Sequence, residues 1–585
     1  MARRICFTRL MLVWLGLLLA GCGTLASGRP EEGQTAVSSA LPTKPALVSA
    51  TPTLSPSATP SLTPSPPPSP TPTPVPPDLS LQAANVVLYP VPQIYSGDRV
   101  TFQVLPFVPD NLAPENVVVH ILVDDQVIAT GALTGRNLAG QALGVLEWAW
   151  DTGGISGAHT VTVVLDPEDV LQIGDENPTN NTVTFPIIVQ ARDALPAPEQ
   201  NATWVTAESA CCLIHAVSGT AAYRDLPELL LTAEAAVQRA SDMLLVSPRQ
   251  KLEIYFIDRV IGQGGYAATA MVISYLDRQY ASQGLLEVLT HETVHVLDRQ
   301  FAPQRIPFMA EGLAVWATGG HYKPEDLDQR MAALLELGEY VPLARLIDDF
   351  YPVQHEIGYL EAAGFVNLLV GRAGWEQFKL FYTDVTADDA PTLSESIDLN
   401  LQLYYGLTLA QLEAEWLAQL QARPADKAAV LDLQTTLRYF NVMRDYQLAY
   451  DPTAYFLTAW LPYPDDVLAQ GNPADLTRHP QAELNITVET MFQSADTALR
   501  AADYNRANVL LDSIVRVLEY DGAFRDPLAI SYRDIVRTVL NRGYEPQQVT
   551  IQGETAVVQA TPFQSTRLVK LNLALRGQDW ALLSN

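Results

Sequence analysis

The sequence predicts a multidomain α+β protein: an antiparallel β-sandwich, then an α+β domain, then a mostly helical region that ends in a small antiparallel sheet. Three observations predict this class. With 585 residues, 48% of them hydrophobic, the chain is too long for one compact core and can bury several. Short alternating runs with turn residues between them fill residues 79–192, which is typical of a sandwich. Helical periodicity and a few strand-like runs share residues 200–422, and helices dominate residues 425–585 until a final alternating stretch.

Residues 1–22 have the features of an export signal. Three arginines flank or precede an apolar run, Met11–Leu19, that is too short to span a bilayer as a permanent helix. The tetrapeptide LAGC that ends at Cys22 resembles the lipobox of bacterial lipoproteins, which implies cleavage before Cys22 and lipidation of its sulfur. The alternatives are a plain cleaved signal and a short anchor helix. With lipid attached, the protein would be exported and anchored to the bacterial cell membrane, facing outside the cytoplasm.

Residues 23–78 are predicted to be a disordered linker, because Pro, Ser and Thr dominate them and large apolar groups are nearly absent. The sandwich that follows ends in GDENPTNNTVTFPIIV, which resembles the last strand of CARDB-type immunoglobulin-like adhesion domains. This resemblance implies a spacer or a module that binds a cell-envelope protein. Asp175, Glu176 and Asn177 in this stretch could bind calcium, but turn chemistry explains them as well, and we favour the turn.

Net charge and cysteine content argue against a nucleic-acid partner and against a zinc site made of cysteines. A formal net charge of -29 argues against a nucleic-acid partner, because phosphates would be repelled. Four cysteines provide neither a disulfide framework nor a cysteine zinc site. Cys211 and Cys212 are adjacent, and we expect two small buried side chains there rather than a vicinal disulfide.

The segment HETVH, residues 291–295, carries the clearest chemistry in the chain. Apolar residues recur at spacings of three and four around it, which predicts a helix over residues 285–301. On a helix, His291 and His295 lie one turn apart on one face, so both imidazoles can reach one Zn²⁺ at about 2.0–2.1 Å. Glu292 can then lean over the open side of the metal and act as general base toward a zinc-activated water. As a strand, the segment would turn Glu292 away from both histidines.

Glu311 is the predicted third ligand. It is the only charged residue between Arg305 and His321, and it shares a helical face with apolar side chains. A buried carboxylate without a partner is costly, and a metal ion would offset that cost. Prolines interrupt the connection between the two helices, so the second helix can fold back on the first.

The pair of segments HETVH and AEGLAVW resembles the gluzincin (peptidase MA-like) metallopeptidases. The resemblance spans roughly residues 203–382 and implies that His291, His295 and Glu311 bind Zn²⁺ and that Glu292 is the general base. It also implies an edge strand beside the cleft, for which AATAMVISYLD (residues 267–277) is the candidate. The sequence departs from two subfamilies: Val315 stands where thermolysin-like enzymes have aspartate, and the aminopeptidase motif G-A-M-E-N is absent. Endopeptidase and aminopeptidase therefore both stay open.

Other polar residues around this motif have two interpretations each. Tyr359 lies in a stretch that resembles the helix after the active site of that group, which implies an oxyanion donor; a core tyrosine with a satisfied hydroxyl is the alternative. Asp298 either orients a ligand histidine or is solvated. His321 and His355 are interpreted as surface residues.

The expected function is therefore zinc-dependent hydrolysis of a peptide or protein substrate at a membrane surface. The main alternative is a non-catalytic surface lipoprotein with a structural or relic zinc site, and a non-peptide substrate is a third. Residues 425–585 contain one helical hairpin of the tetratricopeptide kind but no repeat array and no recognisable chemistry.

Overall fold

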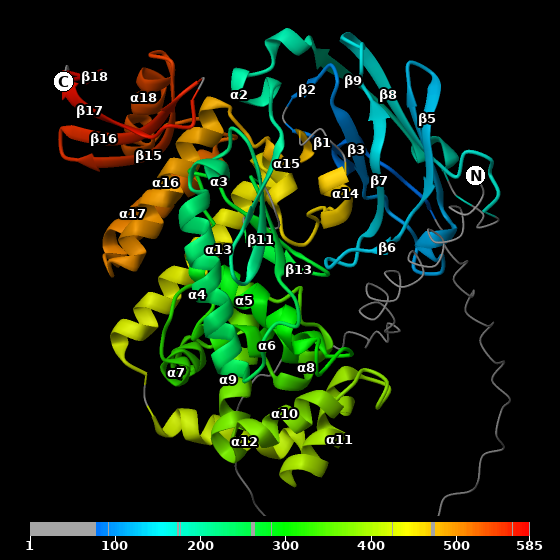
Figure 1. Ribbon diagram of the computed structural model, residues 1–585, viewed down its shortest axis with the longest axis vertical. Coiled ribbons are helices and arrows are strands. Elements are labelled where there is room, and N and C mark those ends of the chain that lie inside the picture. The colour runs from blue at the N-terminus through cyan, green and yellow to red at the C-terminus, as the bar shows by residue number, and fades with distance from the viewer. Residues whose placement is uncertain are drawn as a thin grey trace, which may run out of the picture.

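The computed structural model describes residues 78–583, apart from Pro92, 172–174, Glu176, 259–263, Ser282, Pro424, 470–473 and Gln564. The predicted signal, Cys22 and nearly all of the predicted linker lie outside the described residues. The described chain is a multidomain α+β protein that ends in a small antiparallel sheet (Figure 1).

The N-terminal part consists of two sheets packed face to face, ordered β1-β3-β7-β6 and β2-β9-β8-β4-β5. Neighbouring strands are antiparallel except for β2 and β9. Alternate residues of β4 are buried, as a half-exposed strand requires. The strands are β1 (Val86–Tyr89), β2 (Ile94–Tyr95), β3 (Arg99–Val104), β4 (Val118–Val123), β5 (Gln126–Ala132), β6 (Gly135–Arg136), β7 (Ala142–Asp151), β8 (Gly157–Leu165) and β9 (Thr182–Gln190).

The acidic turn before β9 is held by hydrogen bonds within the protein. The Asp175 carboxylate accepts hydrogen bonds from the Asn181 side chain at 2.6 Å, the Asn177 amide at 3.3 Å and the Leu79 amide at 3.4 Å. Glu176 lies outside the described residues. The bonds from Asn177 and Asn181 lie within this turn, whereas the bond from Leu79 connects the turn to the start of the sandwich.

A mixed sheet follows, in the order β10-β11-β12-β14-β13. Strands β11, β12 and β14 are parallel, whereas β10 and β13 run antiparallel to their neighbours. Helices α4 and α5 cover one face of the sheet, and α14 and α15 contact the other. The elements are α2 (Ala197–Gln200), β10 (Trp204–Glu208), β11 (Cys212–Val217), α3 (Ala221–Arg224), α4 (Leu226–Leu244), β12 (Leu252–Ile257), β13 (Gly265–Ala267), β14 (Met271–Ser274) and α5 (Leu285–Asp298).

Two sequence-based expectations about this sheet are wrong. The segment 267–277 forms β14, which has neighbours on both sides; the edge strand is β13, which precedes it. Cys211 and Cys212 form a disulfide in place of two free thiols. Cys212 is fully buried as expected, whereas Cys211 is partly exposed at the rim of a surface hollow beside α4.

The helices after α5 form the largest hydrophobic core of the chain. Pro307 occupies the first turn of α6, where its missing N–H costs nothing, and Gly319 ends α6 in the left-handed region with φ of 76°. Helix α6 thereby folds back between α5 and α9 (Figure 1). The helices are α6 (Pro307–Thr318), α7 (Leu327–Leu337), α8 (Leu343–Asp348), α9 (His355–Ala373), α10 (Trp375–Asp384), α11 (Leu393–Tyr405) and α12 (Leu409–Ala422).

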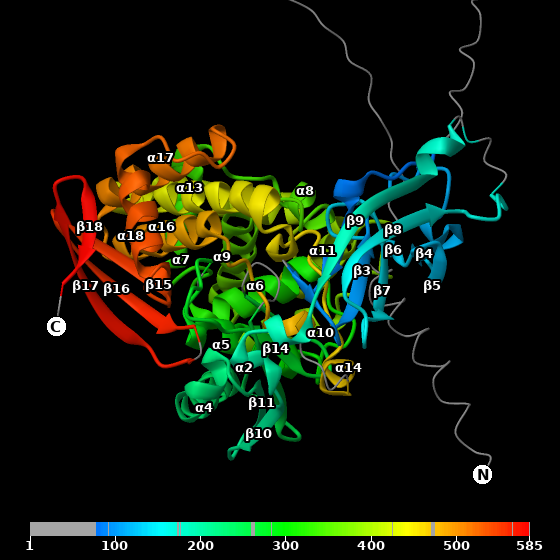
Figure 2. The ribbon, with the colours of Figure 1, turned by 90° about the horizontal axis from the view of Figure 1, so that it is seen from above.

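The C-terminal part is helical until its last sheet, in which β15 to β18 are antiparallel neighbours in chain order. Viewed from above, this sheet lies at the opposite end of the molecule from the sandwich (Figure 2). Helix α13 contributes Leu433 to the core around α6 and Tyr439 to the C-terminal core, so it connects the two. The elements are α13 (Lys427–Tyr450), α14 (Pro464–Ala469), α15 (Ala474–Thr477), α16 (Glu483–Arg500), α17 (Tyr504–Glu519), α18 (Pro527–Leu540), β15 (Tyr544–Gln552), β16 (Thr555–Pro562), β17 (Val569–Arg576) and β18 (Asp579–Leu582).

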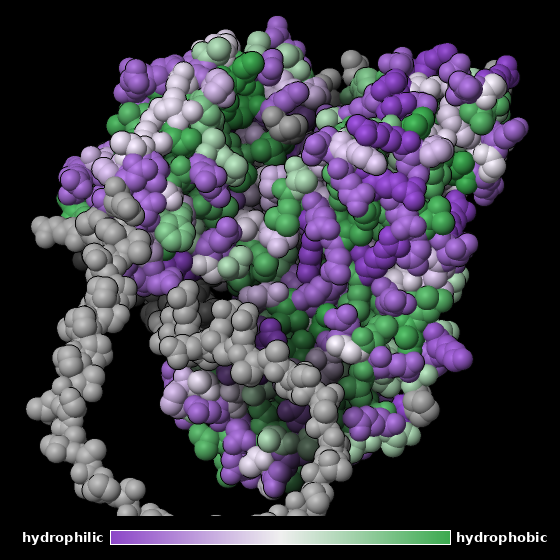
Figure 3. All heavy atoms as spheres, turned by 180° about the vertical axis from the view of Figure 1, so that it is seen from behind, coloured by the Kyte–Doolittle hydropathy of each residue, from purple (hydrophilic) through white to green (hydrophobic). Residues whose placement is uncertain are grey.

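Hydrophilic and hydrophobic side chains are interspersed on the face seen from behind (Figure 3). None of the helices between residues 78 and 583 that the structure describes combines the length and hydropathy that crossing a membrane requires.

Candidate metal centre

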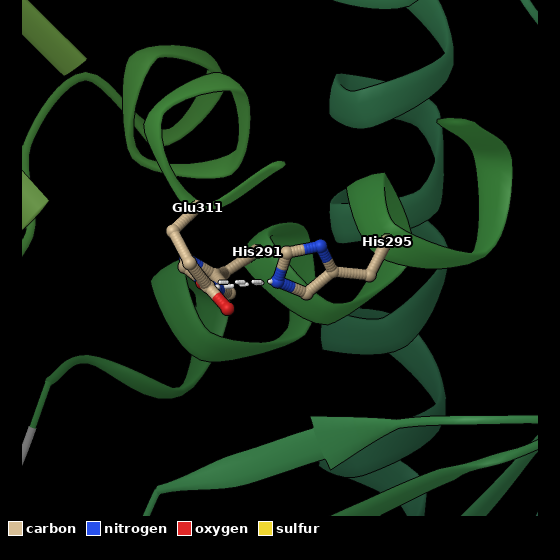
Figure 4. Close-up of side chains that lie close together, drawn as sticks. All are labelled: His291, His295 and Glu311. Atoms are coloured by element: carbon tan, nitrogen blue, oxygen red, sulfur yellow. Dashed lines mark hydrogen bonds and ion pairs between the residues drawn. The ribbon is translucent and has the colours of Figure 1, made fainter. Parts of the chain in front are cut away.

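Helices α5 and α6 bring the three predicted ligands to one point (Figure 4). The Nε2 atoms of His291 and His295, one turn apart on α5, lie 3.1 Å from each other. Oε2 of Glu311 on α6 lies 3.0 Å from the first and 3.2 Å from the second. All three residues are buried or nearly so.

The protonation of this cluster favours a cation at its centre. Burial lowers the pKa of His295 to about 4, so its imidazole is neutral and offers a lone pair. Burial raises the pKa of Glu311, but the two imidazoles outweigh burial and hold that pKa well below its usual value. Burial lowers the pKa of His291, but its hydrogen bond to Glu311 and the neighbouring carboxylates outweigh burial and raise that pKa. The cluster therefore stabilises a positive charge between the carboxylate and the two imidazoles, and either a proton or a metal ion can supply that charge.

The donor set and its spacing fit zinc. Ligand atoms about 2.0–2.1 Å from a tetrahedral Zn²⁺ lie about 3.3 Å from one another, close to the separations found here. Two imidazoles and one carboxylate are also the ligands that a catalytic zinc site uses, with a fourth position left for water or substrate.

Glu292 lies beside this cluster as a buried acid. It is 5% exposed, and its Oε2 is buried without a hydrogen-bond partner among the described residues. Burial raises the pKa of Glu292 to about 7, an effect that His291 opposes and Glu311 reinforces. A carboxyl group with a pKa near neutrality can accept and return a proton, which a general base must do.

Edge strand β13 passes directly over Glu292. A Cβ added at Gly265 would lie 3.3 Å from Cγ of Glu292 and 2.7 Å from Cδ1 of Ile273, so a side chain does not fit there without a shift. Arg299, just after α5, donates hydrogen bonds to the carbonyls of Ala267 at 2.7 Å and Ala268 at 2.8 Å. Helix α5 thus carries the two candidate histidine ligands, and the residue that follows it holds the end of the edge strand. Nothing in the sequence marks Arg299, because its spacing from the HETVH motif is not part of a recognisable pattern.

Two tyrosines complete the surroundings. The ring of Tyr359 stacks near His291 with centroids 6.3 Å apart, and the residue is 7% exposed. Its hydroxyl makes no hydrogen bond to any described residue, which differs from a core tyrosine with a satisfied hydroxyl. Tyr351 donates a hydrogen bond to Oε1 of Glu311 at 3.3 Å. Tyr351 lies in the irregular segment before α9, where no sequence pattern predicts its contact with Glu311.

Three polar residues differ from their expected surroundings. Asp298 is fully buried and not solvated: it pairs with Arg305 at 3.1 Å and accepts a hydrogen bond from Tyr382 at 2.6 Å. It makes no hydrogen bond to His295, whose Nδ1 lacks a partner within the described part of the chain.

The surface interpretation of His321 is wrong, because the residue is buried and bonded to Glu356 and, at 2.8 Å, to Gln283. His355 is only partly buried, yet its Nε2 is fully enclosed and has no partner among the described residues. Both rings lie next to Tyr359, at centroid distances of 4.8 Å for His321 and 5.0 Å for His355.

Comparison with known proteins gives similarities to solved structures only. No protein-family model matches the chain, and no curated protein sequence matches it. The CARDB domain of a Pyrococcus furiosus protein, crystallised with di-metal ions, shares 16% identity over 20% of this chain and 96% of that one, with a TM-score of 0.16. An aminopeptidase N family protein from Idiomarina loihiensis shares 10% identity over 58% of this chain and 77% of that one, with a TM-score of 0.27. Yeast LTA4 hydrolase in complex with bestatin shares 10% identity over 78% of this chain and 81% of that one, with a TM-score of 0.24. These values do not assign a family to the chain.

Proposed function

We propose that the chain is a zinc-dependent peptidase of the gluzincin type, exported and held at the outer surface of the bacterial cell membrane by lipid on Cys22. The observation that carries the proposal is the convergence of His291, His295 and Glu311 within 3.2 Å beside the unpartnered carboxyl group of Glu292. A purely structural site would need the three ligands but not the acid.

Different residues of the chain would bind the metal, transfer the proton, pair with the substrate and stabilise the oxyanion. His291, His295 and Glu311 would hold Zn²⁺, which supplies a water of lowered pKa and polarises a carbonyl group. Glu292 would take a proton and deliver it to the leaving amine. Strand β13 is the last strand of its sheet, so the extended backbone of a substrate could pair with its outer side. The hydroxyl group of Tyr359 would donate to the oxygen that becomes negative.

The experiment uses the full chain purified in detergent. We expect about one zinc per chain by elemental analysis, together with hydrolysis of a mixed peptide library that a chelator abolishes and zinc restores. Glu292→Gln should keep the zinc and lose hydrolysis, and His291→Ala should lose both. Glu336→Gln makes the same chemical change at an exposed position on α7 and should alter neither.

The alternative is a surface lipoprotein whose zinc is structural. Stoichiometric zinc without hydrolysis of any peptide would favour that alternative over a peptidase. Mass spectrometry of the mature N-terminus tests the anchor: acylated Cys22 is expected, and a free N-terminus at another residue would contradict it.

A further inference from the structure

Arg444 lies on α13, on the helix face that it shares with Phe440. Phe440, one turn earlier on the same helix face, has its ring 6.3 Å from that of His321. Beyond the end of α13, Phe456 lies 3.9 Å from the ring of His355. The side chain of Arg444 is therefore placed between two contacts with the histidines that surround Tyr359.

Arg444 has no acidic partner in the described part of the chain. It makes no ion pair and no hydrogen bond there, although the chain contains 65 acidic residues and 36 basic ones. Arg438, on the same helix, shows the usual arrangement: it bonds to Asn508 at 2.6 Å and pairs with Asp512. A partly buried guanidinium without a partner is a costly arrangement, which an incoming anion would relieve.

The polar groups near Arg444 do not pair with its guanidinium. One carboxylate oxygen of the nearby Glu356 is bonded to His321, and the other, Oε2, is buried and makes no hydrogen bond to any described residue, Arg444 included. Nε2 of His355 is buried and lacks a partner among the described residues. Burial lowers the pKa of Arg444, and the charge of Arg444 is, after burial, the largest cause that lowers the pKa of His355, which agrees with their proximity.

His355 connects this region to the candidate metal centre over a short distance. The ring of His355 lies 5.0 Å from that of Tyr359, which in turn lies 6.3 Å from that of His291. An extended peptide advances about 3.3–3.6 Å per residue. A group bound at Arg444 would thus be only a few residues from a peptide bond placed at the metal centre.

We propose that Arg444 binds a carboxylate of the peptide substrate, either its C-terminus or an Asp or Glu side chain, a few residues from the bond that is cleaved. The proposal rests on the proposed peptidase function and names its substrate class: short or acidic peptides. Arginine suits this role, because its guanidinium can hold both oxygens of a carboxylate at once and stays charged at every pH of interest.

The test measures binding, so that it does not depend on turnover. Full-length Glu292→Gln protein in detergent, loaded with zinc, is titrated calorimetrically with three tetra-alanine peptides: the free acid, its C-terminal amide, and an amide with Glu at the last position. We expect the free acid, the Glu-containing amide, or both to bind at least tenfold more tightly than the plain amide, and the pattern identifies the source of the carboxylate. Arg444→Ala in the same background should remove this preference, and Arg444→Lys should retain part of it.

Arg438→Ala is the matched control, because it removes the same charge from the same helix and should leave the preference intact. Equal affinity for all three peptides, or a loss in Arg444→Ala that is the same for all three, would overturn the proposal. The result is separable from the proposed function. If the wild-type protein binds carboxylate-containing peptides selectively but hydrolyses none, the peptidase proposal is rejected and the carboxylate site at Arg444 is supported. If it hydrolyses peptides without preference for a carboxylate, the peptidase proposal is supported and the site at Arg444 is rejected.

Discussion

Gly312 lies next to the candidate ligand Glu311, at a close contact between α6 and α9 that fixes the position of Glu311. A Cβ at Gly312 would lie 2.6 Å from the carbonyl oxygen of Ala362 on α9 and 2.8 Å from its carbonyl carbon. These are backbone atoms and cannot rotate away, so Gly312→Ala must push α6 off α9. The same displacement moves Glu311 relative to the two histidines on α5.

The expected loss follows from two opposing effects. Alanine in place of glycine gains about 1 kcal/mol of helix propensity, whereas overpacking costs about 1–3 kcal/mol, and a backbone contact this short places the cost at the upper end. A net loss of about 1–2 kcal/mol would lower the thermal midpoint by roughly 2–8 °C for a domain of about 200 residues. The affinity for zinc should fall roughly tenfold or more, because displaced support costs that much at other metal sites.

Calorimetry and zinc titration of the full chain measure both effects. Gly371→Ala on α9 is the matched control, since nothing lies within 4 Å of its added Cβ and the position is exposed. It should raise the midpoint slightly and leave zinc affinity unchanged. If Gly312→Ala were as stable as the wild type and bound zinc equally well, the packing argument would be refuted.

Three further predictions concern burial and metal. Burial raises the pKa of the fully buried Glu361 to about 9, so the native state keeps a proton that the unfolded chain releases above about pH 4.5. The free energy of unfolding should therefore fall between about pH 4.5 and pH 9, by up to about 1.4 kcal/mol per pH unit. Thermal melts of Glu361→Gln should show a flatter dependence of stability on pH over this range. Arg278 is 0% exposed and pairs with Glu489 and Glu545, so Arg278→Met should cost about 3–5 kcal/mol in urea unfolding, and Glu489→Gln in that background should recover part of the loss. Zinc at 100 times its dissociation constant should stabilise the wild type by about 2.7 kcal/mol in thermal melts and leave His291→Ala unchanged.

The convergence of the three candidate ligands could be predicted from the sequence because the pattern that indicates it is local. Residues four apart on a helix lie on one face whatever the rest of the fold does, so the placement of His291 and His295 needs only the helix. The placement of Glu311 depends on a contact between two helices, which the sequence also indicates. Glu311 is the single charged residue of an otherwise apolar helix, and burying its carboxylate is costly unless a partner such as the histidine pair lies beside it.

The surroundings of the cluster depend on tertiary contacts that no local pattern encodes. Tyr351 and Arg444 approach from an irregular segment and from a helix far along the chain, and nothing in their neighbouring residues marks them. His321 is buried and is bonded to Gln283 and Glu356, which come from other segments of the chain. Strand β13 is three residues long, which is too short for an alternation of apolar and polar residues to distinguish it from a turn. The segment that contains the longer strand β14 is therefore predicted from the sequence as the edge strand.

The free energy of unfolding that is lost by keeping a buried, ionised Glu292 can distinguish a catalytic site from a non-catalytic relic. In the metal-free protein, burial disfavours the ionised form of Glu292, and no described residue donates a hydrogen bond to its Oε2. Glutamine has nearly the same shape and carries no charge, so Glu292→Gln should stabilise the metal-free protein by on the order of 1–3 kcal/mol at pH 7.5.

Thermal melts of the metal-free wild type and Glu292→Gln, with Glu336→Gln as the control at an exposed position, measure this difference. A residue that lowers stability where it stands, and whose removal abolishes hydrolysis, is retained for chemistry and not for the fold. If Glu292→Gln instead lowered the midpoint, Glu292 would be a structural residue of α5, and the case for a general base at this position would be lost.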